Sequence, residues 1–490
     1  MAVQSLSNAA PSGRLFWYVL PVAALLCITF LYIQYPLRIP FTVTTATSYP
    51  SAATHVRGSN DSHNSSSDNS REKNGEAAVA AAIQPPPDTC AGRYIYVYDL
   101  PSRFNKNILD DCSNLCTWSN MTEFVSNGGL GPRLGRSRGG VFSGSGGWYA
   151  TDQFALDLIF YNRMKEYACL TNDSSRASAV YVPFFAGLDI GRHLLGYNTS
   201  VRDSASLDLV GWLRSRPEWG AMDGRDHFLV AGRIWSDFRR YSDSDLDWGN
   251  KLLRLPEAMN MSVLVLETGP WNDTDISVPY PTYFHPSNDG EVLSWQKKIR
   301  KAERHWLFSF AGAPRPSQAD SIRGRIFEQC RASRRCRLLD CGSKPGDCHS
   351  PRSVIGAFRS TSFCLQPPGD SFTRRSMFDS MVAGCVPVFF HPGSAYVQYR
   401  WHLPRNHSSY SVFIPEEEVR EGKVSIEETL GRIPEGEVRA MREKVIKMIP
   451  RLVYADPKGG EMTAKDAFEV AVEGVIERVG RLRKETTPHE

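Results

Sequence analysis

Residues 363–390 combine the residue types that bind anions. A short apolar stretch leads through a Pro-Pro-Gly turn into the polar residues 370–373, and Arg374 and Arg375 then begin an expected helix. The first turn of a helix is already positive and favours carboxylates, so two arginines at this place indicate a bound anion such as a diphosphate. The alternative is a solvated helix start, in which the arginines pair with Asp379 or with an aspartate of the turn.

The spacing along this expected helix adds two further groups to the anion site. Ser371, Arg375 and Asp379 are four residues apart and would share one helix face. With a diphosphate at the helix start, Asp379 lies two turns further on, where it is predicted to contact a ribose hydroxyl. The order of strand, turn, helix and strand predicts an α/β unit whose loop follows the carboxyl end of a strand, where open sheets bind ligands.

The whole chain has room for two such units. Its 490 residues exceed one ordinary core and suit two lobes with additional segments. The formal net charge is only +4 and 22% of the residues are charged, so the composition gives no indication of a nucleic-acid partner.

An uncharged apolar segment near the amino terminus, residues 16–35, is long enough to cross a bilayer and has aromatic residues at both ends. A cleaved signal peptide is the alternative, but no basic segment or small-residue cleavage motif fits well. We therefore predict a cytosolic tail at residues 1–15 and a signal anchor at residues 16–35. Residues 36–88 are rich in Ser, Thr, Asn and Ala, end in a Pro-Pro-Pro run and have too little apolar content for a core, which predicts a flexible stem.

Glycosylation motifs and cysteines indicate on which side of the membrane the rest of the chain lies. Asn-x-Ser/Thr sequons occur only after the anchor, at Asn60, Asn64, Asn120, Asn172, Asn198, Asn260, Asn272 and Asn406. Cys330, Cys336, Cys341 and Cys348 cluster without a Cys-x-x-Cys pair, which favours local disulfides over zinc. Cys385 is predicted to be a free, buried thiol. The main body is thus predicted to lie in an oxidising lumen.

Strands and helices alternate through this main body, which predicts parallel sheets covered by helices. Apolar, strand-like runs lie at residues 94–98, 179–185, 227–230, 262–267, 306–312 and 337–339. Helical spacing of apolar residues is found at 149–167, 321–330 and 463–482. We place an amino-terminal lobe at 89–300 and a carboxyl-terminal lobe, which includes the final helix, at 301–485.

Several longer motifs carry a family resemblance. They are YIYVYDLPSRFN, AVYVPFFAGLDIGRHL, GRDHFLVAGRIWSDFRR, PYPTYFHP, LFSFAGAPRP and the anion segment continued into HPGSAYVQY. In these motifs, which span nearly all of the main body, the chain resembles the exostosin-like glycosyltransferases of plants. Within that family it is most similar to the xyloglucan galactosyltransferases of the Katamari type.

The resemblance implies a GT-B fold, in which two Rossmann-like lobes enclose the active site, and inversion at the sugar carbon without a metal ion or other cofactor. A UDP-sugar would lie mainly on the carboxyl-terminal lobe, where Gly312 and Arg315 would approach its diphosphate. The anion segment would contribute Asp370, Ser371, Thr373, Arg374, Arg375 and Asp379 to donor binding. Many exostosin relatives carry Glu where this chain has Ser371, and the Gly-Asp-Ser form resembles the galactosyltransferase branch.

Inversion needs a base that takes the proton of the acceptor hydroxyl on the face opposite UDP. In a two-lobed enzyme this base should come from the amino-terminal lobe, where Asp189 follows a strand and a Gly-containing turn; Asp189 could instead cap a helix. The other candidates for the base are Asp152, Glu267 and His193. His227 and Arg233 flank a strand end and are predicted to line the cleft, with a structural histidine as the alternative.

Two aspartate motifs imitate the Asp-x-Asp that holds a divalent ion in GT-A enzymes. Asp243-Ser-Asp245-Leu-Asp247 lies in a polar stretch with no strand before it, and Asp273-Thr-Asp275 overlaps the sequon at Asn272. We interpret both as solvated loops, so no metal ion is predicted.

These observations predict a Golgi enzyme, anchored as a single-pass type II membrane protein, that transfers galactose from UDP-galactose to xylosyl side chains of xyloglucan in a β-linkage. One alternative keeps the fold but uses UDP-galacturonate, UDP-arabinose or another UDP-sugar, because donor choice depends on few contacts. Another alternative is a non-catalytic Golgi subunit that binds glycans or acts as a scaffold. Other Golgi glycosyltransferases are candidate partners.

Overall fold

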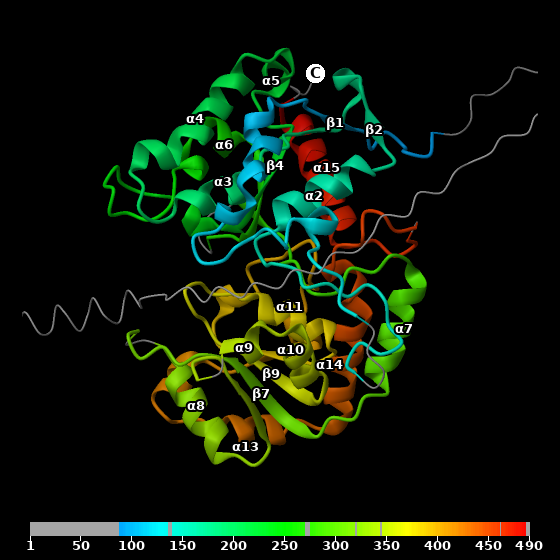
Figure 1. Cartoon of the computed structure of the whole chain (residues 1–490). Coiled ribbons are helices and arrows are strands. Elements are labelled where there is room, and N and C mark those ends of the chain that lie inside the picture. The colour runs from blue at the N-terminus through cyan, green and yellow to red at the C-terminus, as the bar shows by residue number, and fades with distance from the viewer. Residues whose placement is uncertain are drawn as a thin grey trace, which may run out of the picture. The chain divides into compact units, whose positions relative to one another are not determined.

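The computed structural model describes residues 88–135, 140–269, 275–318, 321–343, 345–460 and 462–486. The predicted tail and signal anchor and nearly all of the predicted stem lie outside these ranges. Among the described helices, none is long and apolar enough to cross a membrane. Pro85–Glu490 forms one compact unit, within which two α/β lobes can be distinguished (Figure 1).

The first lobe is built on a six-stranded sheet in which all neighbouring strands are parallel. Across the sheet the strands are β2 (Leu170–Thr171), β1 (Ile95–Val97), β3 (Ala179–Tyr181), β4 (His227–Ile234), β5 (Ser262–Glu267) and β6 (Asp275–Ser277). The helices in this part of the chain are α2 (Leu156–Lys165), α3 (Ala186–His193), α4 (Thr199–Arg214), α5 (Pro217–Met222) and α6 (Pro256–Asn260).

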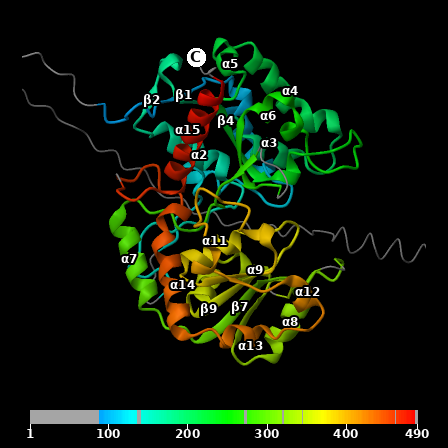
Figure 2. The ribbon, with the colours of Figure 1, turned by 180° about the vertical axis from the view of Figure 1, so that it is seen from behind.

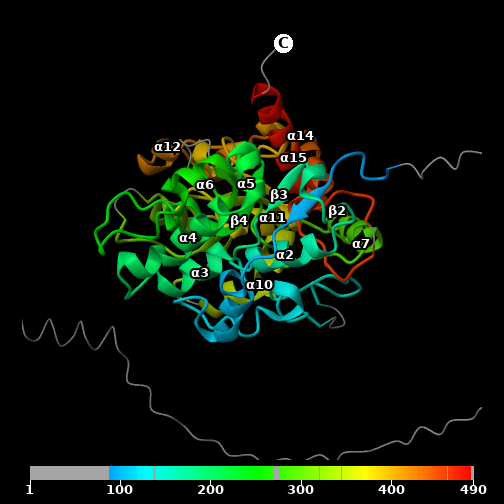
Figure 3. The same cartoon turned by 90° about the horizontal axis from the view of Figure 1, so that it is seen from above.

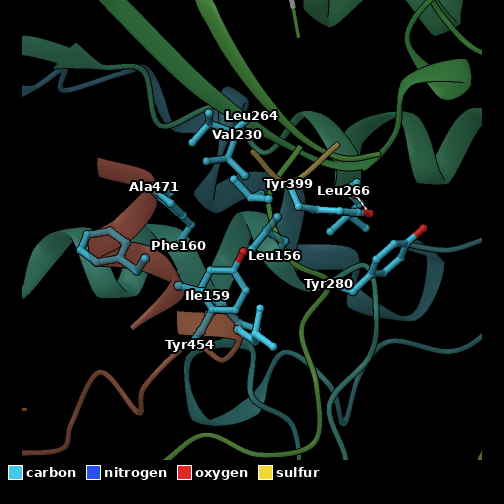
Figure 4. Packing of buried hydrophobic residues seen from close by; sticks show 14 of the residues in the cluster. Leu156, Ile159, Phe160, Val230, Leu264, Leu266, Tyr280, Tyr399, Tyr454 and Ala471 are labelled. Atoms are coloured by element: carbon cyan, nitrogen blue, oxygen red, sulfur yellow. Dashed lines mark hydrogen bonds between the residues drawn. The ribbon is translucent and has the colours of Figure 1, made fainter. Parts of the chain in front are cut away.

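Both faces of this first sheet are apolar and covered by helices. Phe228 and Val230 of β4 pack with Phe160 of α2, as Figure 4 shows for Val230 and Phe160. Leu229 and Ala231, which alternate with them, pack with α3, α4 and α6 on the other face. A parallel strand buried on both faces needs apolar side chains at successive positions, which explains why the strands were visible as unbroken apolar runs in the sequence.

The second lobe is built on a five-stranded sheet, which is also parallel throughout. Across it lie β11 (Val412–Phe413), β10 (Val386–Phe389), β9 (Thr361–Gln366), β7 (Trp306–Gly312) and β8 (Cys336–Asp340). Its helices are α8 (Arg323–Ala332), α9 (Pro345–His349), α10 (Pro351–Arg359), α11 (Arg375–Val382), α12 (Glu416–Arg420), α13 (Ile426–Gly431) and α14 (Glu435–Met448). Figure 2 shows β7 and β9 between α14 on one side and α8 and α12 on the other.

The two helices at the borders of the lobes pack on the lobe opposite to the one predicted for them. In α7 (Asp289–Arg300), Trp295 donates a hydrogen bond to Val382 O at 2.8 Å, and the helix packs on α14 of the second lobe. In α15 (Ala467–Thr486), Phe468 packs against Phe160 in the core of the first lobe. Seen from above, α15 and α2 lie on one side of β4, and α4 and α6 lie on the other (Figure 3).

The prediction of two α/β lobes with parallel sheets is therefore confirmed, but the grouping of residues 89–300 and 301–485 needs correction at both ends. Helix α7 belongs with the second lobe, and the final helix returns to the first. The apolar face of α15 was visible in the sequence, whereas the sheet that it covers depends on contacts with residues about 300 positions away.

Four disulfides connect parts of the described chain, and they join Cys90 to Cys169, Cys330 to Cys336, Cys341 to Cys348 and Cys364 to Cys385. The local pairing predicted for the four clustered cysteines is confirmed. The prediction of a free thiol at Cys385 is wrong, because the parallel pairing of β9 with β10 brings Cys364 close to Cys385, the residue before β10, and the two form a disulfide. Cys112 and Cys116 are the free cysteines among the described residues.

Candidate active site

Three arginines converge at the carboxyl edge of the second sheet. Arg315 lies in the loop after β7, Arg323 is the first residue of α8, and Arg374 is the residue before α11. Arg315 pairs with Asp370 through two parallel hydrogen bonds, one of which joins Nη2 to Oδ2 at 2.8 Å. Arg374 approaches the same carboxylate, with Nη2 at 3.4 Å from Oδ2. We call Arg315, Arg323, Arg374 and Asp370 the arginine cluster.

The turn after β9 is shaped to hold this cluster. Pro367 and Pro368 cannot donate to the sheet and end the strand, and the carbonyl of Pro368 accepts a hydrogen bond from Arg323 Nε at 3.0 Å. At Gly369 an added Cβ would lie 1.8 Å from the guanidinium of Arg374, so only glycine allows this arginine to cross the turn. The sequence of the turn thus fixes where two of the guanidinium groups lie.

The arginine cluster has more positive than negative charge, and this excess favours the binding of an anion. Burial, followed by the positive charges of Arg374 and Arg315, lowers the pKa of Arg323 to about 10. Burial acts to raise the pKa of Asp370, but hydrogen bonding from Arg315 and the charges of Arg374 and Arg315 outweigh it and leave that pKa lowered. One carboxylate, more than half exposed, therefore pairs with two guanidinium groups, and the charge of Arg323 acts on it as well.

Glu267 brings the first lobe to the loop that carries the cluster. It is the last residue of β5 and is almost completely buried. Its Oε1 accepts hydrogen bonds from Tyr280 at 2.6 Å and from Ser371 at 2.9 Å, and its Oε2 accepts one from the backbone N–H of Thr373 at 3.1 Å. Burial nevertheless raises the pKa of Glu267 to about 7, against the lowering effect of Tyr280 and Arg374.

Several predicted donor residues lie beside the cluster. Ser371 also accepts a hydrogen bond from Arg374 Nη1 at 3.1 Å, so it links Arg374 to Glu267. Thr373 is buried and donates its hydroxyl to the carbonyl of Ser394. Gly312 ends β7 at the edge of the cluster, although the nearest atoms to an added Cβ would belong to the Phe310 ring, at 2.6 Å.

Arg375 and Asp379 do not join the cluster. They form an ion pair within α11, with Nε and Oδ2 3.2 Å apart, and Asp379 is only 2% exposed. The guanidinium of Arg375 lies 3.6 Å from the Tyr283 ring centroid and donates to Thr151 O at 2.5 Å, so it points at the first lobe. Since Asp379 is enclosed and helix α11 starts after Ser371, the predicted shared face and ribose contact do not fit the structure.

His227 and Arg233 have structural contacts instead of lining the cleft. His227 begins β4, at the sheet edge away from Glu267, and it is completely buried between Tyr98, 2.9 Å from Nε2, and Asp226, 2.7 Å from Nδ1. Arg233 lies near the carboxyl end of β4 but is 1% exposed and donates to Gly187 O at 2.9 Å. The prediction that they line the cleft is wrong because β4 is enclosed on both faces.

Asp189, the predicted base, lies inside α3 and therefore does not cap a helix. It is 3% exposed, accepts a hydrogen bond from Arg192, and has a pKa raised by burial. Of the alternatives, Asp152 accepts a hydrogen bond from the backbone N–H of Phe154 at 2.8 Å. His193 is the last residue of α3, and burial lowers its pKa. Glu267 is the alternative whose hydrogen bonds reach the loop of the arginine cluster.

The aspartate motifs are used in local contacts. Asp243 pairs with Arg240 at 3.2 Å, Asp245 accepts the N–H of Thr199 at 2.6 Å, and Asp247 accepts the hydroxyl of Ser242 at 2.5 Å. Asp275 opens β6 and is buried against Arg239, so its interpretation as part of a solvated loop is wrong. Asp273 lies outside the described residues.

Five of the sequon asparagines lie in the described part of the chain, and three (Asn60, Asn64 and Asn272) lie outside it. Exposed side chains belong to Asn120, Asn172, Asn198 and Asn406, whereas Asn260 is half-buried and donates to Asp223 O at 2.8 Å. Asn198 also caps α4 by accepting the N–H of Val201 at 3.1 Å.

Sequence reasoning missed Arg323 altogether. It stands in the first turn of its helix, the same unfavourable place for a cation that drew attention to Arg374, so the same criterion would have found it. The role of Glu267 as a link to the second lobe could not be found in this way, because Ser371 and Thr373 are more than 100 residues away.

Two parallel α/β sheets with a cluster of arginines at the carboxyl ends of the strands are typical of proteins that bind ligands at this end of the sheet. The chain belongs to the exostosin GT47 family of glycosyltransferases, since a family model described as Exostosin GT47 domain matches residues 89–430.

The chain is also similar to individual proteins of Arabidopsis thaliana. It is 61% identical over 397 residues to xyloglucan galactosyltransferase MUR3, and this alignment covers 81% of this chain and 64% of MUR3. It is 50% identical over 402 residues to probable xyloglucan galactosyltransferase GT12, covering 81% and 78%. It is 40% identical over 398 residues to xyloglucan-specific galacturonosyltransferase 1, covering 81% and 58%. Among solved structures, a glycosyltransferase from Rickettsia africae aligns at a TM-score of 0.35 and 8% identity, covering 80% of this chain and 99% of that one.

Proposed function

We propose that this protein is an inverting, GT-B-type glycosyltransferase that transfers galactose from UDP-galactose to xylosyl side chains of xyloglucan. Membership of the GT47 family supports the class of reaction, and the names of the relatives support the donor and acceptor. The arginine cluster is the single observation that carries the donor site.

The proposed donor diphosphate takes the place of Asp370 among the guanidinium groups. Arg315 and Arg374 already hold a carboxylate in this position, and a diphosphate offers more negative charge and more acceptor oxygens than one carboxylate. As the bond to galactose breaks, negative charge grows on the departing UDP. Fixed guanidinium groups stabilise that charge where it develops, which is the role that a divalent ion has in other enzymes. The proposal includes no metal ion.

Asp189 is the proposed base for the acceptor hydroxyl, and Glu267 is its alternative. Burial raises the pKa of both carboxyl groups, as a general base near neutral pH requires. Glu267 has hydrogen bonds to Tyr280, Ser371 and Thr373, so its first role in the proposal is to position residues 367–374, which we call the donor loop. Comparison of Asp189→Asn with Glu267→Gln separates the two: the base variant should lose turnover with UDP affinity retained, and the positioning variant should lose both.

The proposed location is the Golgi lumen, with the protein anchored as a single-pass type II membrane protein. The apolar segment at residues 16–35 and the sequons after it support this location. Protease protection of the carboxyl terminus in intact Golgi vesicles, with digestion after detergent, is the expected result; digestion without detergent would contradict it.

The decisive experiment incubates the purified full-length protein with xyloglucan and, separately, with UDP-galactose, UDP-galacturonate, UDP-arabinose and UDP-glucose, and determines the linkage formed. Transfer of galactose in a β-linkage to xylose is expected, with no loss of rate on addition of chelator. Transfer of another sugar alone would reject the donor, and a large loss with chelator would reject the metal-free site.

A galacturonosyl donor is the second candidate, because one relative at 40% identity is named as a xyloglucan-specific galacturonosyltransferase. The same panel of donors distinguishes it. A non-catalytic scaffold is the third, and it has no use for three guanidinium groups around one carboxylate; binding of glycan without binding of UDP would favour it.

A further inference from the structure

A second cationic region lies beside the donor loop and has no role in the proposed transfer. It is a groove of about 1400 Å³ between residues 395–405 of the second lobe, the end of α14, and α15. Its lining includes Thr268, which follows Glu267 in the chain. The backbone N–H of Thr268 donates to Gln398 Oε1 at 2.9 Å. Gln398 in turn donates to the carbonyl of Gly393, so this side chain forms part of the wall toward the donor loop. We call this cavity the basic groove.

The groove is lined by seven Lys and Arg residues and three carboxylates. Two of the carboxylates already have partners: Glu473 binds Lys465 at 2.7 Å through both oxygens, and Asp275 binds Arg239. Five cations of the groove form no ion pair with a carboxylate in the described part of the chain. They are Arg400, Arg405, Lys447, Arg451 and Arg481. Seven cations against three carboxylates give the lining of the groove an excess of positive charge.

Arg451 shows that this charge is not only a feature of the open surface. Its side chain is half-buried, its Nη2 donates to the carbonyl of Trp401, and its Nε has no hydrogen-bond partner. Burial lowers the pKa of Arg451. The charge of Glu473 opposes this lowering, but Arg451 forms no ion pair within the described ranges, and a half-buried cation without a directly paired carboxylate costs free energy unless a ligand compensates it.

Flat rings line the groove together with these cations. The Trp401 indole packs against α15 at Gly474, where an added Cβ would lie 2.3 Å from the ring. The Tyr396 ring stacks on His407 at 4.1 Å between centroids. Ligand sites of this kind combine flat apolar surfaces with a few charged groups, and pockets for drug-sized molecules measure about 300–1,000 Å³, so this groove has room for an oligosaccharide.

We propose that the basic groove binds an acidic oligosaccharide, a chain of sugar rings that carries the carboxylates of uronate residues. Guanidinium groups pair with carboxylates through two hydrogen bonds, and repeated uronates would match cations distributed along a groove. The choice of a glycan over another polyanion rests on the proposed function, since the neighbouring site is proposed to act on a polysaccharide. Bound there, an acidic polymer would raise the local concentration of attached glycan at the transfer site.

The test measures binding of a galacturonate decamer to the full-length protein by calorimetry, with a neutral xyloglucan oligosaccharide and UDP as competitors. The variant Arg405→Gln/Lys447→Gln removes two exposed cations, and Arg432→Gln/Arg439→Gln removes two exposed cations elsewhere on the second lobe as a matched control. Asn406→Gln is introduced into all proteins, because a glycan next to Arg405 would itself cover the rim.

The groove variant should bind the decamer about tenfold more weakly than the control variant, with unchanged thermal stability. Absence of binding, or equal loss in both double variants, would overturn the proposal. Displacement of the decamer by UDP or by xyloglucan would also overturn it, because the groove would then belong to the donor or acceptor site. Decamer binding by a protein that transfers no sugar would support the groove while rejecting the proposed function.

Discussion

Two arginine-rich regions lie at the seam between the lobes, and they differ in their counterions. In the arginine cluster, Asp370 occupies the space between Arg315 and Arg374. In the basic groove, cations such as Arg405 and Arg451 form no ion pair with a carboxylate among the described residues, and two of the three carboxylates in the lining pair with other cations. The cluster lies at the end of a sheet and the groove lies between helices and a loop.

This difference indicates two kinds of anion recognition. A ligand of the cluster must displace an internal carboxylate, which favours a compact and strongly charged group such as a diphosphate. A ligand of the groove displaces only water and salt ions, so weak and repeated charges suffice. The cluster is also held by buried contacts from both lobes, whereas most cations of the groove are exposed. Four predictions test these distinctions.

The largest expected effect is on stability, from the buried pair that holds the helix of the cluster. Asp379→Ala leaves Arg375 without its partner and should lower the free energy of unfolding by about 3–5 kcal/mol, measured by denaturant titration. Asp243→Ala breaks a pair in which the aspartate is 80% exposed and should cost less than about 1 kcal/mol. Equal costs would mean that the α11 pair is not a structural support.

The next effect is on catalysis. Arg374→Ala removes a guanidinium from the proposed diphosphate site and should lower kcat/KM for UDP-galactose about 100-fold or more, with thermal stability retained. Arg439→Ala, an exposed arginine paired with Glu435, is the control and should leave the rate within about twofold. An Arg374→Ala enzyme with nearly normal turnover would separate the cluster from the donor.

A smaller effect is expected on the pH dependence of stability. Burial raises the pKa of Glu267 to about 7 from an ordinary 4.5, so the folded protein binds this proton more tightly than the unfolded chain. The contribution of Glu267 to the free energy of unfolding is therefore fully present below about pH 4.5 and is lost as the pH rises through about 7. Relative to Glu267→Gln, the native protein should lose up to about 3 kcal/mol of unfolding free energy as the pH rises from about 4.5 to above about 7.

The control for this pH prediction is Glu443→Gln. Arg300 lowers the pKa of Glu443 on the surface, so this group stabilises the folded state at higher pH and its difference curve should have the opposite sign and a smaller size. Parallel curves for the two variants would show that Glu267 is not perturbed in the manner described.

The smallest effect concerns a single charge of the groove. Arg405→Gln should weaken binding of the galacturonate decamer by about 1 kcal/mol or less, and added salt should reduce the difference between native and variant proteins. UDP affinity, which depends on the partly buried cluster, should respond less to salt. A stronger salt effect on UDP than on the decamer would reverse the assignment of the two regions.

Much of the fold could be predicted from the sequence, because buried parallel strands need apolar residues on both faces. The strands at residues 262–267 and 306–312 were predicted with the boundaries that the structure has. At the site, residue types and the family resemblance predicted that Asp370 and Arg374 bind the donor, and the structure brings their side chains together. The prediction did not separate Arg374 from Arg375, since the helix begins between them and their side chains take different directions.

The sequence by itself determined the strands, the helices, the local disulfides and the family motifs, all of which depend on residues close together in the chain. Tertiary structure alone decided which lobes α7 and α15 cover, that Cys364 pairs with Cys385, and that Glu267 holds the loop of the arginine cluster. The basic groove also depends on the tertiary structure, because its lining combines the end of α14, α15 and a loop of the second lobe. Such contacts join residues up to about 300 positions apart, and no local pattern specifies which partner a buried charge or apolar face will meet.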